Sequence, residues 1–393
     1  MPLPGSLGET VHFLRQDLRE HLAEVPPGKR AATLFRRLSK YLLASFFYFT
    51  GLTGPLLRRS LLSSDACLII GFHGTPDAPP GFFSRGHAIS NVRSQLRFLK
   101  KHLRPVALDE IALAISRGDS PRAASFAVTF DDGLVSNAIH AMPVLQDLGI
   151  PATFFIPSAF VGSTRDLWVS SLREILRNWR EESIPDEPGL WPSLPVGSEA
   201  DRYAAFFRIK QTLKSNERKR QEVLDRIVER AGGHIRPPAG DRVVDLDLLR
   251  RMLLPGFSVG AHTRNHFILS SLDPEAAWEE IEGSRRDLEQ LVGNPVLDFA
   301  YPNGCFPNLS EVTCRLVAEA GFRSAVTTEP GIVRRGDDRL ALRRCLPGNV
   351  PAFLAAFELL IRAWRDRRRP GDLGVPLAAR VSCLGPREAR SAA

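Results

Sequence analysis

The sequence predicts an α/β fold in which parallel strands alternate with helices, either in an open sheet or in a closed barrel. From residue 65 onward, short apolar runs alternate with amphipathic stretches at helical spacing, which is the pattern of strands joined by helical crossovers. The 393 residues include 44% hydrophobic and 24% charged side chains, an ordinary globular composition. A chain of this length forms one large domain or two medium ones and can bury its own core.

Three buried strands and one helix mark the first part of this alternation. The strands are expected at 66–72, 125–130 and 153–156, because each is a short apolar run bounded by turn residues. Apolar side chains at helical spacing over 139–148 predict a helix between the second and third strands, and Gly149 ends it.

The second part repeats the pattern. A strand at 257–259 precedes a helix that Asp273 and Pro274 open and Gly293 closes. The later elements are expected as strands at 296–301, 323–327 and 340–346 and as helices at 311–320 and 351–364.

The alternation stops between residues 163 and 255, where we expect a helical insertion. The stretch 183–195 is rich in proline and contains Trp191, and 203–230 is a long charged segment that is expected to be helical. Loops at the carboxyl ends of barrel strands tolerate such growth. The final residues, 366–393, are small, polar or basic and are expected to form a disordered tail.

The N-terminal region, 1–64, is expected to be helical, and its segment 41–57 contains no charged residue. Three interpretations are open: a packed helix followed by a turn, an interfacial helix on an anionic bilayer, or a spanning helix, for which 17 residues are short. The second would make a peripheral membrane contact. The segment is flanked by Arg36, Arg37, Lys40, Arg58 and Arg59.

Charge and cysteine content limit the partners and the compartment. A net charge of +8 suits an anionic glycan, a lipid headgroup or nucleic acid, but no basic stripe is interleaved with aromatics, so no nucleic-acid partner is expected. Five cysteines without a Cys-x-x-Cys pair favour a reducing compartment. The first thirty residues carry charge throughout and predict no secretory signal. We therefore expect a cytoplasmic protein, or one peripheral on the inner face of the cytoplasmic membrane; nothing indicates the oligomeric state.

Asp131 and Asp132 give the sharpest chemical signal, because they follow a buried strand and precede Gly133. Two carboxylates at one cavity repel each other unless a cation or a proton separates their roles. A bound metal with one aspartate as ligand and the other as base would solve this. The alternative is a plain turn in which Asp132 caps the next helix.

His262 and His266 give the second signal and also follow a strand. A His-x-x-x-His spacing places two imidazoles on one face if the backbone turns helically there. Combined with an aspartate, they form a three-ligand set with an open position, as in catalytic zinc sites, and other first-row divalent metals would also be accepted.

The run Phe299-Ala300-Tyr301-Pro302-Asn303-Gly304 gives the third signal. A rigid loop of this composition at a strand end exposes backbone N–H groups that can face a developing oxyanion. The alternative is an ordinary turn.

Together these motifs resemble those of the NodB-type polysaccharide deacetylases. The resemblance covers about 66–351, interrupted by the insertion, and depends on Thr-Phe-Asp-Asp-Gly at 129–133, His-Thr-Arg-Asn-His at 262–266 and Ile-Pro-Ala-Thr-Phe-Phe at 150–155. Phe72-His73-Gly74 and the 299–304 run resemble a bacterial branch linked to surface-polysaccharide synthesis.

The resemblance implies a distorted TIM-like (β/α) barrel with fewer than eight strands over 65–365. It implies that Asp132, His262 and His266 bind a divalent metal, with Zn²⁺ expected first and Mn²⁺, Co²⁺ or Fe²⁺ as alternatives. Asp131 would be the general base, and the backbone at Tyr301 would hold the oxyanion. The implied reaction removes an N-acetyl group from an amino sugar of a polysaccharide or a lipid-linked glycan.

The sequence departs from the family pattern at two places. No histidine follows His266, and Asp298 and Phe299 stand where the third motif usually supplies an arginine. If activity is kept, His73 at the end of the first strand would be the acid, and Arg343 or Arg344 would brace Asp131. Further substrate-binding candidates are Pro302, Asn303, Arg344 and Trp191, although Trp191 could instead be a local packing anchor.

Two other functions are compatible with these departures. One is a non-catalytic, metal-dependent glycan-binding or assembly protein, which the missing acid would favour. The other is a deacylase acting on a different N-acyl sugar, such as an N-formyl sugar.

Overall fold

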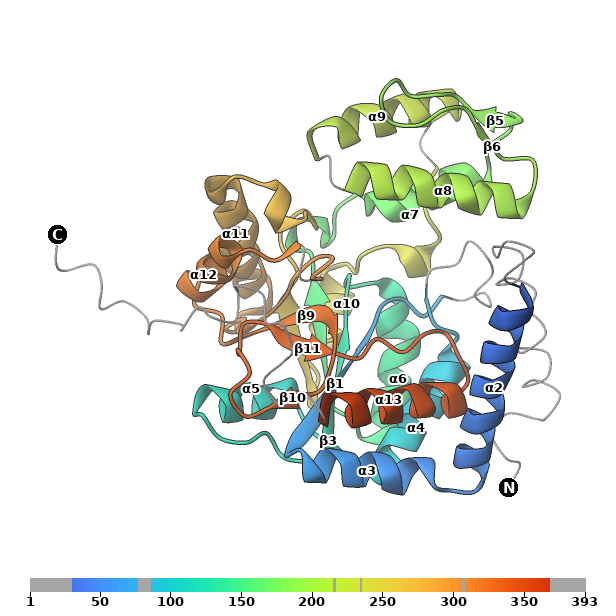
Figure 1. Ribbon diagram of the computed structural model, residues 1–393. Coiled ribbons are helices and arrows are strands. Elements are labelled where there is room, and N and C mark those ends of the chain that lie inside the picture. Colours follow the sequence, from blue (N-terminus) through green and yellow to red (C-terminus); the bar gives the residue numbers. More distant parts are fainter. Residues whose placement is uncertain (1–29, 77–85, 215–216, 234, 306–307, 368–393) are drawn as a thin grey trace.

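The computed structural model describes residues 30–76, 86–214, 217–233, 235–305 and 308–367 (Figure 1). Within these residues, seven parallel strands pair in the order β1-β3-β4-β7-β8-β9-β11. Their bounds are β1 (Ala66–Phe72), β3 (Ser125–Phe130), β4 (Ala152–Ile156), β7 (Phe257–Ala261), β8 (Asp298–Ala300), β9 (Ser324–Pro330) and β11 (Leu342–Arg344).

The sheet closes on itself next to β1. Ile70 and Cys345 form a parallel bridge, in which the Cys345 N–H donates to Ile69 O and the Gly71 N–H donates to Cys345 O. The predicted distorted barrel with fewer than eight strands is therefore confirmed. Two strands of two residues each, β2 (Arg104–Pro105) and β10 (Val333–Arg334), pair with β3 and β1 outside the ring; they are too short for a sequence period to reveal.

Helices cover the outside of the ring. They are α4 (Ile89–His102), α5 (Leu108–Ser116), α6 (Met142–Leu148), α11 (Pro274–Val292), α12 (Glu311–Glu319) and α13 (Ala352–Arg367). The predicted ends of α11 are confirmed: the Asp273 side chain accepts from the Ala276 N–H, and Gly293 has a left-handed φ of 69°. A π-helical turn (Asn137–Ala141) precedes α6, which ends at Gly149 as predicted.

Three phenylalanines on neighbouring strands fix the register at the edge that carries the chemistry. Phe72, Phe130 and Phe154 are aligned in the ladders, and consecutive ring centroids lie 5.4 Å apart. They belong to the main core, which also holds apolar side chains of α4 and α6. Because side chains alternate along a strand, Thr129 and Asp131 point to the opposite, inner face.

The insertion between β4 and β7 lies above the carboxyl ends of the strands in Figure 1. The elements that lie there are α7 (Trp168–Arg177), β5 (Ser183–Ile184), β6 (Leu194–Pro195), α8 (Glu199–Lys214) and α9 (Glu217–Arg230) (Figure 1). The last helix before β7, α10 (Leu246–Arg251), packs against the main core instead. The insertion has its own apolar cluster, which includes Leu172, Trp191 and Phe206. The predicted charged helical segment at 203–230 is confirmed, and it consists of two helices, α8 and α9.

The N-terminal helices are α2 (Arg30–Phe49) and α3 (Thr53–Ser63). Within the described residues, no helix combines the length and the apolar character needed to cross a bilayer. The first 29 residues, where no secretory signal is predicted, lie outside the described part of the chain. The start of the disordered tail, predicted at residue 366, is wrong, because Asp366 is buried in α13 and accepts the Ile332 N–H. Residues 368–393 lie outside the described part.

Candidate active site

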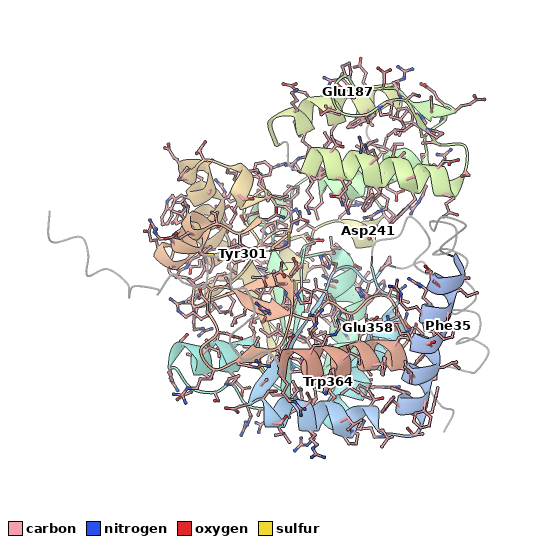
Figure 2. The ribbon with its side chains drawn as sticks, in the orientation of Figure 1. Phe35, Glu187, Asp241, Tyr301, Glu358 and Trp364 are labelled. Atoms are coloured by element: carbon pink, nitrogen blue, oxygen red, sulfur yellow. The ribbon has the colours of Figure 1, made fainter. Side chains whose placement is uncertain are left out.

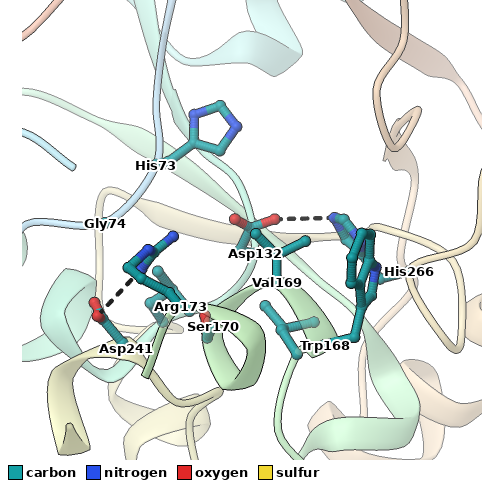
Figure 3. Close-up of a pocket in the computed structure, with 11 residues that line it drawn as sticks. His73, Gly74, Asp132, Trp168, Val169, Ser170, Arg173, Asp241 and His266 are labelled. Carbon is teal, nitrogen blue, oxygen red and sulfur yellow. Dashed lines mark ion pairs between the residues drawn. The ribbon is translucent and has the colours of Figure 1, made fainter. Parts of the chain in front are cut away.

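The candidate site lies at the carboxyl ends of three strands. His73 follows β1, Asp131 and Asp132 follow β3, and His262 follows β7. This is the edge at which parallel barrels hold their active sites. Figure 3 shows Asp132 between His73 and His266 at a narrow pocket.

Asp132, His262 and His266 come together as a set of three metal-binding groups. Asp132 Oδ1 lies 3.1 Å from His266 Nε2 and 3.6 Å from His262 Nε2, and one ligand atom of each residue lies within 4.8 Å of the others. Zinc bonds of about 2.0–2.2 Å in a tetrahedron would separate the ligand atoms by about 3.3–3.6 Å. The three residues therefore fit a small divalent ion.

Hydrogen bonds and burial prepare these groups as ligands. His262 Nδ1 lies 2.7 Å from Ala300 O, so this nitrogen donates, and the lone pair of Nε2 would be offered to a bound metal. Burial opposes ionisation of Asp132, but hydrogen bonds from His262 and His266 outweigh it and hold the carboxyl pKa well below its ordinary value. Asp132 thus offers an anionic oxygen to a metal ion.

The backbone at the site is left-handed at residues that rarely adopt this conformation. Asp132, Thr263 and His266 have φ values of 70°, 62° and 58°. Such conformations cluster at functional sites, because the surrounding structure must hold them in place. They also correct the expected helical turn at 262–266: the two imidazoles meet because the loop reverses direction, not because a helix repeats.

Glu280 of α11 holds that loop from behind. Its buried carboxylate accepts the Asn265 backbone N–H at 2.8 Å and the Asn265 side-chain Nδ2 at 2.6 Å. The Arg264 N–H donates to the backbone carbonyl of the same glutamate. This clamp fixes the segment between the two histidines and offsets the strain at Thr263 and His266.

Asp131 is braced by Arg344 of β11. Its two carboxylate oxygens accept from Arg344 Nη1 and Nη2, each at 2.7 Å, and the guanidinium also donates to Thr129 Oγ1 and Thr327 O. Burial opposes ionisation of Asp131, yet Arg344 lowers the carboxyl pKa below its ordinary value. Arg344 is fully buried, so its predicted role in binding substrate is wrong; of the two bracing candidates, Arg344 makes the contact.

His73 faces the same pocket from the other side. Its Nε2 lies 4.0 Å from Asp131 Oδ2, and its side chain is 23% exposed. It lines the pocket with Asp132 and His266. A partly exposed imidazole beside a buried carboxylate can exchange a proton with a molecule in that pocket.

Comparison with known proteins assigns the chain to a family. The family model described as "Polysaccharide deacetylase" matches residues 118–184 and 193–325, about half of the chain. The chain belongs to the polysaccharide deacetylase family. The predicted resemblance is confirmed.

Individual relatives are more distant. The curated Bacillus subtilis (strain 168) protein YxkH, whose name assigns it to the polysaccharide deacetylases, is 28% identical over 96 residues, which is 24% of this chain and only 33% of that protein. The structure of Streptococcus pyogenes deacetylase PplD in complex with acetate covers 75% of this chain and 98% of its own, with 16% identity and a TM-score of 0.49. IcaB from Ammonifex degensii covers 76% and 97%, with 18% identity and the same TM-score.

The third motif of this deacetylase-family chain is not arranged as predicted. The Tyr301 N–H donates to Val326 O at 3.2 Å within the sheet, and its buried hydroxyl donates to Leu340 O. Tyr301 therefore directs neither donor at the pocket. Pro302 is buried and Asn303 half-buried, and neither lines the pocket, so their assignment as substrate contacts is not supported.

Trp191 is a packing residue. It is buried in the insertion's own cluster, and its indole N–H donates to Pro185 O at 3.2 Å. The predicted stacking on a sugar is wrong, and the alternative of a local anchor holds.

The insertion supplies pocket residues that the sequence did not reveal. Trp168, Ser170 and Arg173 of α7 line the pocket together with Asp241, and Arg173 Nη1 lies 3.5 Å from Asp241 Oδ2 (Figure 3). The Arg220 guanidinium lies 5.1 Å from the ring centres of both Trp168 and Phe267 and so ties the insertion to the loop after His266. The available signal was a tryptophan near the start of the insertion, where Trp168 begins α7.

Proposed function

We propose that this protein is a metal-dependent hydrolase that removes the N-acetyl group from an amino sugar of a polysaccharide or a lipid-linked glycan. The observation that carries the proposal is the division of labour between adjacent carboxylates: Asp132 lies with two histidines, while Asp131 lies with Arg344 and near His73. Family membership supports the same reaction class.

Asp132, His262 and His266 would hold the metal, which we expect to be Zn²⁺. A divalent ion at such a site lowers the pKa of bound water and polarises an acyl oxygen. The mixed nitrogen and oxygen set also suits Mn²⁺, Co²⁺ and Fe²⁺.

Asp131 would act as the base. Its carboxylate is ionised because Arg344 is paired with it, and it lies next to the ligand residue Asp132. As the water oxygen forms its bond to the acyl carbon, Asp131 takes the proton that the water loses.

His73 would act as the acid. When the carbon–nitrogen bond breaks, the sugar nitrogen needs one proton, and the His73 imidazolium supplies it from the pocket side opposite His266. The products are the free amino sugar and acetate; the proton on Asp131 then returns to His73 through solvent, which restores both groups.

Trp168, Arg173 and Asp241 would contact the sugar. An indole face packs against the apolar face of a pyranose ring, and Trp168 stands half-buried beside His266 in the pocket wall. The Arg173 and Asp241 pair offers donors and acceptors for ring hydroxyls.

Acetate release from N-acetylglucosamine oligomers tests the proposal. Full-length wild type loaded with Zn²⁺ should release acetate, and Asp131→Asn, which leaves the ligand set intact, should not. A protein that binds the oligomers and metal without releasing acetate would instead be a glycan-binding protein. Release of formate but not acetate from a matched panel would redefine the acyl group.

A further inference from the structure

Helix α2 has two apolar faces, and only one of them is packed. Tyr41 and Ala44 are buried in a cluster with Phe353 and Phe357 of α13. The other face carries an outer stripe, which we define as Phe35, Leu38, Leu42, Phe46 and Phe49. These residues are spaced three or four apart, as residues on one helix face are, and are 74%, 40%, 71%, 59% and 62% exposed.

This concentration of exposed apolar side chains is confined to one region. Of fifteen large apolar side chains exposed in the described chain, nine lie between Phe35 and Leu62. Leu52 and Leu56 continue the exposed apolar surface into α3. Exposed apolar patches of this kind mark interaction surfaces.

The charges that α2 and α3 themselves carry have one sign, and one of them, Lys40, is paired with Glu358 of α13. Residues 30–64 include six basic side chains and no acidic one, and Arg36, Arg58 and Arg59 are exposed. A second copy docked through the same face would bring like charges together. An anionic lipid surface instead matches both the apolar stripe and its basic flanks.

We propose that α2 docks this protein on the surface of an anionic lipid bilayer, with the outer stripe in the headgroup region and the arginines on lipid phosphates. This moves the expected contact from 41–57 to the outer stripe, because part of 41–57 packs inside. The surface is separate from the candidate site, and the inference does not depend on the proposed reaction.

A groove beside α2 extends the same surface toward the strand ends. It has a volume of about 790 Å³ and lies between α2 and α13, with Phe35, Leu43 and Ile361 beside the basic Arg36 and Arg362. Pro330, which ends β9, and Leu346, which follows β11, also line it. Figure 2 labels Phe35 at α2 and Glu358 on the facing helix α13. A docked bilayer would thus lie alongside the edge of the sheet that carries the candidate site.

Co-sedimentation of the full-length protein with vesicles tests this proposal. We expect binding to phosphatidylcholine vesicles that contain phosphatidylglycerol, weakening with salt, and little binding to phosphatidylcholine alone. Leu42→Gln/Phe46→Gln should lower the partition coefficient at least about tenfold, and so should Arg36→Gln/Arg58→Gln. The matched control is Phe207→Gln, at a side chain 47% exposed on α8, which should bind like wild type.

Three results would overturn the inference. The first is a wild type that binds neither kind of vesicle, and the second is a stripe variant that binds vesicles as tightly as wild type. The third is a wild type that forms a dimer while the stripe variant is a monomer, which would identify the face as a contact between copies. Circular dichroism on each variant shows whether it is folded. If the stripe variant does not fold, the arginine variant decides, because its side chains are exposed.

Discussion

Arg344 and Asp131 form a bidentate ion pair that is buried on both sides, with side-chain exposures of 0% and 2%. Arg344 comes from the last strand of the ring and Asp131 from the end of β3, and the strand between them is β1. The strand that closes the barrel therefore also carries the arginine that neutralises the proposed base.

Arg344→Gln should lower both stability and activity. Removing one partner of a buried ion pair leaves an uncompensated charge and costs about 3–5 kcal/mol. We expect this loss in urea unfolding, together with loss of acetate release. Arg343→Gln is the matched control, because Arg343 points to the opposite side of β11 and is only half-buried. Equal unfolding midpoints for Arg344→Gln and wild type would contradict the account.

His73→Asn should reduce turnover without removing the metal. A positioned acid contributes about 10²–10⁴-fold, so kcat should fall by that order while metal content stays unchanged. The pH–rate profile should also lose the limb that reports the acid. Unchanged kcat and an unchanged profile would show that another group protonates the sugar nitrogen.

Trp168 and Trp191 should respond differently to alanine. Trp168 lines the pocket and is only half-buried, so Trp168→Ala should raise KM for the glycan and cost less stability than Trp191→Ala. Trp191 is buried in the insertion, so Trp191→Ala should destabilise the fold by about 3–5 kcal/mol. Parallel steady-state kinetics and urea unfolding separate the two effects; identical behaviour of the variants would refute this division.

Asp298 should make stability depend on pH between about 4 and 6. Burial raises the pKa of Asp298 to about 6 from an ordinary 3.8, although the Ser324 hydroxyl partly opposes this. The folded state therefore binds more protons than the unfolded state in this window, and stability falls as pH rises through it. The total is roughly 3 kcal/mol for a shift of about two units.

Asp298→Asn removes this titration while it retains an acceptor for Ser324. The variant should be more stable than wild type above about pH 6 and similar to it near pH 4, in unfolding measured across that range. A difference in the free energy of unfolding between variant and wild type that does not change with pH would mean that Asp298 does not titrate in this range. Arg323 Nη2, which lies 3.7 Å from the Asp298 carboxylate, would then stabilise its charge.

The strands and the residues at their ends were readable from sequence because each signal was local. A buried run followed by Asp131 and Asp132, or by His262, needs only strand periodicity and the rule that parallel strands end at one edge. The ends of α11 were equally local, since Asp273 and Gly293 cap it.

The predictions that were wrong concern contacts between residues far apart in the sequence. Arg344 lies 213 residues from Asp131, and nothing in its neighbourhood distinguishes a buried brace from a substrate contact. The Tyr301 N–H was assigned to an oxyanion because the loop composition allowed it, whereas the pairing of β8 with β9 engages it. Trp168 rather than Trp191 lines the pocket, because the packing of the insertion is a tertiary property.

Metal content per chain tests the central claim most directly. Full-length protein purified without chelators should hold about one equivalent of a divalent metal. Asp132→Ala and His262→Ala should lose it, and Asp131→Asn should keep it, because Asp131 is engaged by Arg344 rather than by the histidines. A wild type that takes up neither Zn²⁺ nor Co²⁺, or ligand variants that keep the metal as wild type does, would contradict the account.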